Sequence, residues 1–366
     1  MQQSATLFVP LRDGDEAPLW RALAKNGEPL EVRDIRLVEG GLALRMTGTE
    51  LRAGEDTELQ FEDEDASISA SHRLVLSGGV PTLADVVAIT AWLRDRARIV
   101  DIALVRALGG ADAIGAVQWL LSEPGFEREQ LAELHLNRAL DLNLLAQVPQ
   151  IAAPGLLLMD MDSTAIQIEC IDEIAKLAGV GEKVAEVTEL TMQGKLDFSA
   201  SLRARVATLT GHPLALLEQV AAAIPLTDGL EQLIAALHRR GWVVGIVSGG
   251  FTYFTDRLQR RLGLDFTRAN TLEIVDGRLS GRVDGPVIDA VAKAETLIAW
   301  AQQRGLELSQ TVAAGDGAND LKMLAKAGLG VAFHAKPVVR AQAAANISHG
   351  GIEAIYYLLA DTSDLL

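Results

Sequence analysis

Cysteine and positive charge are both scarce in this sequence. Its 366 residues include one cysteine, Cys170, so the chain can form no internal disulfide, which suits a reducing compartment. Lysine and arginine number 33 against 49 aspartates and glutamates, a formal net charge of −16. Because nucleic acid and anionic lipid both attract basic surfaces, this balance argues against either of them as a partner.

Long apolar runs are also missing. The sequence has no uninterrupted run of about 18 apolar residues, the length that a membrane-spanning helix needs. The first 16 residues also lack the basic and apolar regions of a signal peptide. Nevertheless, 49% of the residues are hydrophobic, which is enough for more than one core. We therefore expect a cytoplasmic globular protein of two or three domains, at about 150 residues per domain.

The first part of the chain, residues 1–108, is predicted to form a ferredoxin-like α+β domain. Strands and helices are expected in the order β-α-β-β-α-β, which is typical of that sandwich, over residues 7–11, 16–25, 31–38, 42–46, 82–98 and 99–105. The acidic stretch 55–65 is interpreted as a solvated loop. Two helices, over 111–122 and 127–147, make residues 109–153 a predicted helical linker. By analogy with other ferredoxin-like domains of metabolic enzymes, this part is expected to bind an amino acid or to pair subunits in a homodimer.

The second part, residues 154–366, alternates short apolar runs with helical segments, as in a doubly wound parallel sheet. The predicted strands cover residues 156–159, 243–247, 311–314 and 329–333. A helical cap at about 170–225 interrupts the alternation, and Asp276-Gly277 predicts a β-hairpin. Sites in such sheets lie at the carboxyl ends of the strands, and polar clusters follow three of these runs directly.

The first cluster contains Asp160 and Asp162, two carboxylates one residue apart. Such a pair can divide the roles of nucleophile and general acid, or it can hold a hard cation. Alternatively, the acidic and hydroxyl side chains of Asp160–Thr164 cap the following helix.

The other clusters suit an anion and a metal ion. Gly315–Asp320 adds carboxylates and an amide, the oxygen donors that Mg²⁺ prefers; its alternative is an ordinary tight turn. Ser248 and Gly249 offer a hydroxyl group and open backbone N–H groups to an anion, although Ser-Gly-Gly turns are common. Lys293, the only lysine between Lys195 and Lys322, suits a phosphate, unless it is a solvated helix lysine.

These four motifs, in this order, resemble those of the haloacid-dehalogenase-like phosphatases. More narrowly, QIECIDEIAKLA at 167–178 and DFSASLRARV at 197–206 are similar to the phosphoserine phosphatases of that superfamily. The resemblance is close over about 150–350. Residues 1–150 resemble the amino-terminal extension of bacterial members only loosely.

The resemblance implies roles for the motif residues. Asp160 would attack phosphorus and form an aspartyl-phosphate, and Asp162 would act as general acid and base. Mg²⁺, the implied cofactor, would be held by the carboxylates of Asp160 and Asp316 and by the backbone carbonyl of Asp162. Ser248, the Gly249 N–H and Lys293 would stabilise the charge of the transferring phosphoryl group. Asn319 and Asp320 would complete the surroundings of the metal and the lysine.

The resemblance also implies a substrate. Glu169 would bind an ammonium group, Arg205 a carboxylate, and Met192 and Phe198 would form an apolar wall, so the small phosphomonoester would be O-phospho-L-serine, hydrolysed in the last step of serine biosynthesis. Two alternatives remain open: another small phosphomonoester, or a receiver or sensor without turnover. We interpret Cys170 as inert packing.

Overall fold

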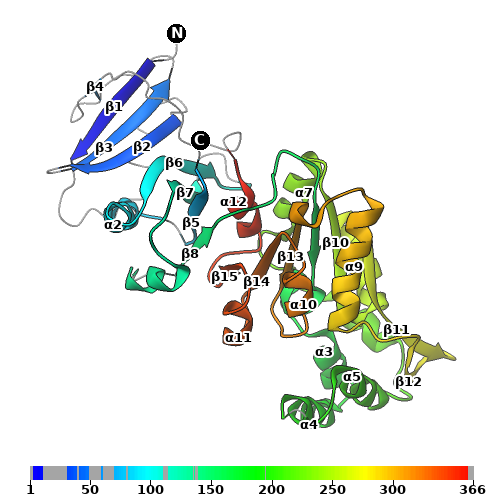
Figure 1. Ribbon diagram of the computed structural model, residues 1–366. Coiled ribbons are helices and arrows are strands. Elements are labelled where there is room, and N and C mark those ends of the chain that lie inside the picture. The colour runs from blue at the N-terminus through cyan, green and yellow to red at the C-terminus, as the bar shows by residue number, and fades with distance from the viewer. Residues whose placement is uncertain are drawn as a thin grey trace. The chain divides into compact units, whose positions relative to one another are not determined.

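The computed structural model describes residues 3–10, 31–38, 41–48, 59–60, 70–79, 81–109, 114–134, 136, 139–193 and 195–361. The chain divides into two compact units (Figure 1). Unit 1 contains residues 1–148 and 345–366, and unit 2 contains residues 149–344. Residues 345–361, which the sequence analysis placed with the second part of the chain, therefore belong to unit 1.

The first sheet of unit 1 is antiparallel. Its strands are β1 (Gln3–Pro10), β2 (Glu31–Val38), β3 (Gly41–Gly48) and β4 (Leu59–Gln60), in the order β2-β3-β1-β4. The strands predicted at 31–38 and 42–46 are confirmed, and they pair with each other as expected. The helix predicted over 16–25 lies outside the described residues, as does most of the acidic stretch 55–65.

The second sheet of unit 1 is also antiparallel, in the order β6-β7-β5-β8. Its elements are β5 (His72–Gly78), α2 (Leu83–Leu93), β6 (Arg98–Arg106), β7 (Ile114–Ser122), η2 (Arg128–Glu133) and β8 (Leu140–Leu145). This is the predicted order of strands and helices, but it spans 72–145 and has a 3₁₀ helix where the second helix was expected. A ferredoxin-like domain over 1–108 is therefore not confirmed.

The predicted helical linker was wrong. Residues 111–122 contain β7 in place of a helix, and 127–147 contain η2 and then β8. The cause is burial on both faces: β7 lies between β6 and β5 in the sheet and is buried along most of its length. Such a strand has no alternation of apolar and polar residues, so periodicity cannot distinguish it from a buried helix.

The carboxyl-terminal segment completes unit 1. It contains β15 (Ala345–Ile347) and α12 (Ala354–Leu359). The buried carboxylate of Asp141 in β8 accepts hydrogen bonds from the backbone N–H groups of Ser348 at 2.9 Å and His349 at 3.0 Å. Gln118 of β7 donates to the carbonyl of Tyr357 at 2.8 Å. These bonds fasten the segment to the second sheet.

Unit 2 has the predicted α/β core. The strands of its sheet that lie within residues 149–344 run in the order β12-β11-β10-β9-β13-β14. They are β9 (Leu156–Met159), β10 (Val243–Phe251), β11 (Phe266–Val275), β12 (Arg278–Asp284), β13 (Thr311–Gly315) and β14 (Leu329–Phe333). All neighbouring pairs among β11, β10, β9, β13 and β14 are parallel. The four predicted strands are confirmed, and the hairpin at Asp276-Gly277 joins β11 to β12.

Helices cover this sheet and form the cap. The core helices are α7 (Leu230–Arg239), α8 (Thr252–Leu262), α9 (Ala290–Gln303), α10 (Leu321–Leu324) and α11 (Pro337–Arg340), with η4 (Leu308–Gln310) before β13. The cap contains α3 (Cys170–Leu177), α4 (Gly181–Met192), α5 (Phe198–Ala207) and α6 (Ala215–Ala222) (Figure 1). These four helices occupy the segment at about 170–225 that was predicted to be a helical cap. Among the described residues, no helix is long and apolar enough to cross a membrane.

Candidate active site

The sheet of unit 2 gathers the motif residues at one edge. Asp160 directly follows β9, Ser248 and Gly249 lie in the last part of β10, and Asp316 directly follows β13. These three strands are neighbours and run parallel, in the order β10-β9-β13. Their carboxyl ends therefore meet, as the sequence predicted.

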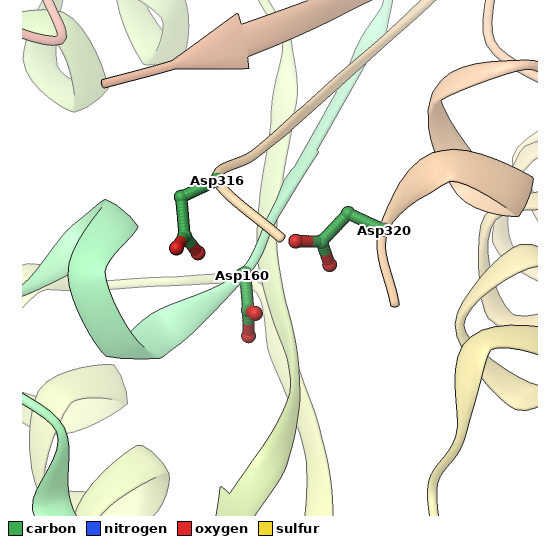
Figure 2. Close-up of side chains that lie close together, drawn as sticks. All are labelled: Asp160, Asp316 and Asp320. Atoms are coloured by element: carbon green, nitrogen blue, oxygen red, sulfur yellow. The ribbon is translucent and has the colours of Figure 1, made fainter. Parts of the chain in front are cut away.

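Three carboxylates lie together at this edge. Figure 2 shows Asp160, Asp316 and Asp320 around a common space, and one oxygen of each lies within 4.8 Å of the others. Burial, with repulsion from Asp160 and Asp320, raises the pKa of Asp316 to about 7. Burial likewise raises the pKa of Asp320 to about 6, against the attraction of Lys293. A crowded set of oxygen donors with excess negative charge fits a hard divalent cation such as Mg²⁺.

Lys293 joins this carboxylate cluster from α9. Its ammonium nitrogen lies 2.6 Å from Asp160 Oδ2 and 2.7 Å from Asp320 Oδ1, and its side chain is fully buried. Burial alone would lower the pKa of Lys293, but the attractions of Asp160 and Asp320 outweigh it and the net pKa is raised. Lys293 is therefore a permanent cation in the site, and the solvated helix lysine is excluded.

A tight turn brings the second carboxylate back to the site. In η3 (Met161–Ala165), Ser163 has a left-handed φ of 54°. Asp162 Oδ1 accepts a hydrogen bond from the backbone N–H of Cys170 at 3.0 Å. On Gly250, a Cβ atom would lie 2.7 Å from Asp162 Oδ2, so the two strand ends approach closely there because Gly250 has no side chain.

The environment of Asp162 favours its protonated form. Burial raises its pKa well above the usual range, and the negative charges of Glu169 and Asp160 raise it further. A carboxyl group that keeps its proton near neutral pH can donate that proton to a leaving group. Asp160 and Asp162, although only two residues apart, thus have different surroundings.

The Ser-Gly-Gly segment forms the third side of the site. Ser248 is fully buried, and its Oγ accepts a hydrogen bond from the backbone N–H of Gly250 at 2.8 Å. With that acceptor position used, the hydroxyl proton is available to an anion in the site. A Cβ on Gly249 would lie 2.6 Å from the Phe198 ring, so this cap residue packs directly on the segment.

The cap places opposite charges near the same edge. Glu169 accepts a hydrogen bond from the hydroxyl of Ser163 at 2.9 Å, and burial raises its pKa. Arg205 is half-buried, and its buried Nε–H has no hydrogen-bond partner among the described residues. Burial lowers the pKa of Arg205, while Asp172 and Glu169 attract its charge. An unpartnered guanidinium N–H beside a carboxylate is suited to an amphoteric ligand.

The remaining predicted residues lie in or beside the site. Asn319 lies within the Gly315–Asp320 turn, where its side-chain oxygen occupies the space that a Cβ on Gly317 would need. Met192 ends α4, but its side chain lies outside the described residues. Cys170 is buried, and burial with the charge of Asp162 raises its pKa, so it is a neutral thiol.

Asp172 was not predicted from the sequence as a site residue, yet its charge is the largest attraction on the Arg205 guanidinium. The signal was available, because Asp172 lies three residues after Glu169 and residues at that spacing share a helix face.

Comparison with known proteins identifies the class. The model of the haloacid dehalogenase-like hydrolases matches residues 155–328, which contain all the site residues described above, so the fold and the site define a hydrolase of that class. The phosphoserine phosphatase of Vibrio cholerae serotype O1 is 56% identical over 220 residues, 60% of this chain and 67% of that protein.

Solved structures agree. An unliganded probable phosphoserine phosphatase from Vibrio cholerae aligns with a TM-score of 0.67 and 45% identity, over 79% of this chain and 86% of that one. A structure described as a phospho-aspartyl intermediate analogue of phosphoserine phosphatase has a TM-score of 0.54 and 43% identity, over 57% of this chain and all of that one. This chain belongs to the phosphoserine phosphatase family.

Proposed function

We propose that this chain is a Mg²⁺-dependent phosphatase that hydrolyses O-phospho-L-serine to L-serine and phosphate, as the last step of serine biosynthesis in the cytoplasm. The observation that carries the proposal is the contact of one buried lysine, Lys293, with Asp160 at 2.6 Å and Asp320 at 2.7 Å, beside a second carboxyl group, Asp162, that favours its protonated form.

Asp160 is the nucleophile of the proposed reaction. One of its carboxylate oxygens attacks phosphorus while the bond from phosphorus to the serine oxygen breaks, and the phosphoryl group becomes an aspartyl-phosphate. Asp162 donates its proton to the departing serine oxygen. Water then attacks the aspartyl-phosphate, Asp162 takes a proton from that water, and phosphate leaves with Asp160 restored.

The surrounding groups stabilise the charge that moves during the reaction. Lys293, the Ser248 hydroxyl and the Gly249 N–H face the transferring phosphoryl oxygens, with Asn319 and Asp320 holding their surroundings. Asp160, Asp316 and the backbone carbonyl of Asp162 would hold Mg²⁺, which when bound supplies positive charge to the phosphate and offsets the crowded carboxylates.

The cap supplies selectivity for an amino acid. Phosphoserine carries a carboxylate and an ammonium group besides its phosphate, and Arg205 and Glu169 offer the complementary charges. The unpartnered Nε–H of Arg205 supports this assignment, because a bound carboxylate would satisfy it. Phe198, with Met192, would cover the reacting atoms and exclude water.

Phosphate release tests the proposal. Purified protein with Mg²⁺ is assayed on O-phospho-L-serine, phosphothreonine and glycerol phosphate, with Asp160→Asn as the inactive control. Arg205→Ala is expected to lower kcat/KM about 100-fold for phosphoserine, but only slightly for glycerol phosphate, which has no carboxylate.

The same helix supplies a matched control. Arg203 in α5 is exposed and donates to the backbone carbonyls of Val283 and Gly285, so Arg203→Ala should leave kcat/KM nearly unchanged. A wild type that releases no phosphate from phosphoserine would refute the proposal. Stable phosphoprotein without phosphate release would point instead to a receiver or sensor.

A further inference from the structure

The buried amide of Asn270 connects two parts of the site. Asn270 lies in β11 and is 1% exposed. Its Nδ2 donates to the backbone carbonyl of Gly249 at 2.8 Å, and its Oδ1 accepts from the backbone N–H of Ile288 at 2.8 Å. Both partners fix the orientation of the amide, because reversing it would place oxygen against oxygen and N–H against N–H.

One end of this bridge holds the Ser-Gly-Gly segment. The pairing of β10 with β11 is regular to Val247, shifts register, and resumes at Phe251, which lies opposite Asn270. The intervening residues, Ser248 to Gly250, therefore bulge out of the parallel ladder. Asn270 replaces the missing ladder bond by binding the Gly249 carbonyl.

That bond fixes a peptide group which in turn holds Ser248. The peptide between Gly249 and Gly250 has its carbonyl bound to Asn270, and its N–H donates to Ser248 Oγ at 2.8 Å. Peptide groups are planar, so fixing the carbonyl direction fixes the N–H direction. The position of the Ser248 hydroxyl thus depends on the amide of Asn270.

The other end of the bridge leads to Lys293. Ile288 directly precedes Asp289, which caps α9 by accepting hydrogen bonds from the N–H groups of Val291 and Ala292, both at 2.9 Å. Lys293 donates its backbone N–H to the Asp289 carbonyl at 2.9 Å, in the first turn of the same helix. The start of the helix that carries Lys293 is therefore tied to the same amide that fixes Ser248.

We propose that Asn270 is a positioning residue that fixes the Ser248 hydroxyl and the Lys293 ammonium in the positions needed to contact the transferring phosphoryl group. It does not touch the substrate and acts through the Gly249–Gly250 peptide and the start of α9. This inference rests on the proposed phosphatase function, and it adds a residue from a strand that contributes no side chain to the reaction.

A double-mutant cycle with Ser248 tests the inference. Asn270→Asp keeps the shape and the acceptor for Ile288, but at pH 8 it sets an oxygen against the Gly249 carbonyl. We expect kcat to fall about 10- to 100-fold with KM changed less than about threefold, since a displacement of about 1 Å near the reacting atoms costs roughly that much. Ser248→Ala alone is expected to cost at least about 100-fold. The double variant should be slower than Ser248→Ala by clearly less than the full factor of Asn270→Asp, because Ser248→Ala has already removed one of the two groups that Asn270 positions.

Unit 1 provides a matched control for buried-amide substitutions. Asn143 is 2% exposed and makes the same two kinds of bond, donating to the Asn346 carbonyl at 2.9 Å and accepting from the Asn346 N–H at 2.7 Å. Asn143→Asp should lower the melting temperature and leave kcat of the folded protein unchanged.

Two outcomes would overturn the inference: a folded Asn270→Asp variant with kcat within twofold of wild type, or losses in the double variant that multiply as independent effects. If Asn270→Asp does not fold, Asn270→Ser is taken through the same cycle. All variants are also assayed on p-nitrophenyl phosphate. A wild type that cleaves this compound but not phosphoserine refutes the proposed substrate, and the cycle still decides the role of Asn270.

Discussion

Replacing Lys293 by methionine isolates the electrostatic balance of the site. Methionine has a similar length and no charge, so Lys293→Met leaves Asp160 and Asp320 buried without their shared cation. Removing one partner of a buried ion pair costs about 3–5 kcal/mol. Both contacts are short, at 2.6 and 2.7 Å, and neither carboxylate is appreciably exposed, so we expect a loss in that range above neutral pH.

The loss should depend on pH in a definite direction. Without Lys293, which lowers the pKa of Asp320, the pKa of Asp320 in the folded variant should lie above its wild-type value of about 6. A carboxyl group whose folded pKa exceeds its unfolded pKa binds more protons when folded, so stability falls as pH rises from about 4 through the folded pKa. The deficit of Lys293→Met relative to wild type should therefore be larger at pH 8 than at pH 5.5.

Denaturant unfolding at several pH values, with a metal chelator present throughout, measures this deficit. Lys326→Met is the control, since Lys326 is exposed and its replacement should change the unfolding free energy by less than about 0.5 kcal/mol at every pH. A deficit below about 1 kcal/mol for Lys293→Met, or one independent of pH, would refute the reasoning. The phosphatase turnover of Lys293→Met should fall at least about 100-fold.

Three further predictions concern other parts of the molecule. Gly249→Ala places a Cβ 2.6 Å from the Phe198 ring and should raise KM about tenfold by displacing the cap residue; the second substitution Phe198→Leu should recover part of the loss in steady-state kinetics. Because the metal-free pKa of Asp316 is about 7, protons compete with Mg²⁺ below that pH, and the Mg²⁺ concentration for half-maximal activity should rise from pH 8 to pH 6; an unchanged value would contradict it. Asp141→Ala leaves the N–H groups of Ser348 and His349 without their acceptor and should destabilise unit 1 by about 1–3 kcal/mol in thermal unfolding, with kcat unaltered.

The strands and the site of unit 2 could be predicted because short local sequence patterns indicate them. Each central strand is a short apolar run that ends at a polar motif, as at Met159 and Asp160. Parallel strands then bring those motifs together without further information. Asn270 could not be found in this way, since its value lies in bonds to Gly249 and Ile288, which only the register of β11 and the path of the chain before α9 bring within reach.

Unit 1 was harder to predict, also for a physical reason. In β7, residues such as Val117 and Trp119 share full burial with nearly all their neighbours, so the strand lacks the alternation that marks a half-exposed one. The return of residues 345–366 to unit 1 could not be predicted either. It depends on contacts such as the hydrogen bond from the Ser348 N–H to Asp141, two residues that are 207 positions apart in sequence, and local sequence patterns carry no information about contacts at that separation.

The return of the carboxyl-terminal segment to unit 1 makes the catalytic unit an insertion within a host domain. Residues 149–344 are continuous in sequence, whereas the host consists of 1–148 together with 345–366. During synthesis the catalytic unit can therefore form most of its core while the host still lacks α12. The buried N–H acceptor at Asp141 gains its partners only when residues 348 and 349 have been made. We therefore expect the host, although residues 1–148 are translated first, to finish folding after the catalytic unit.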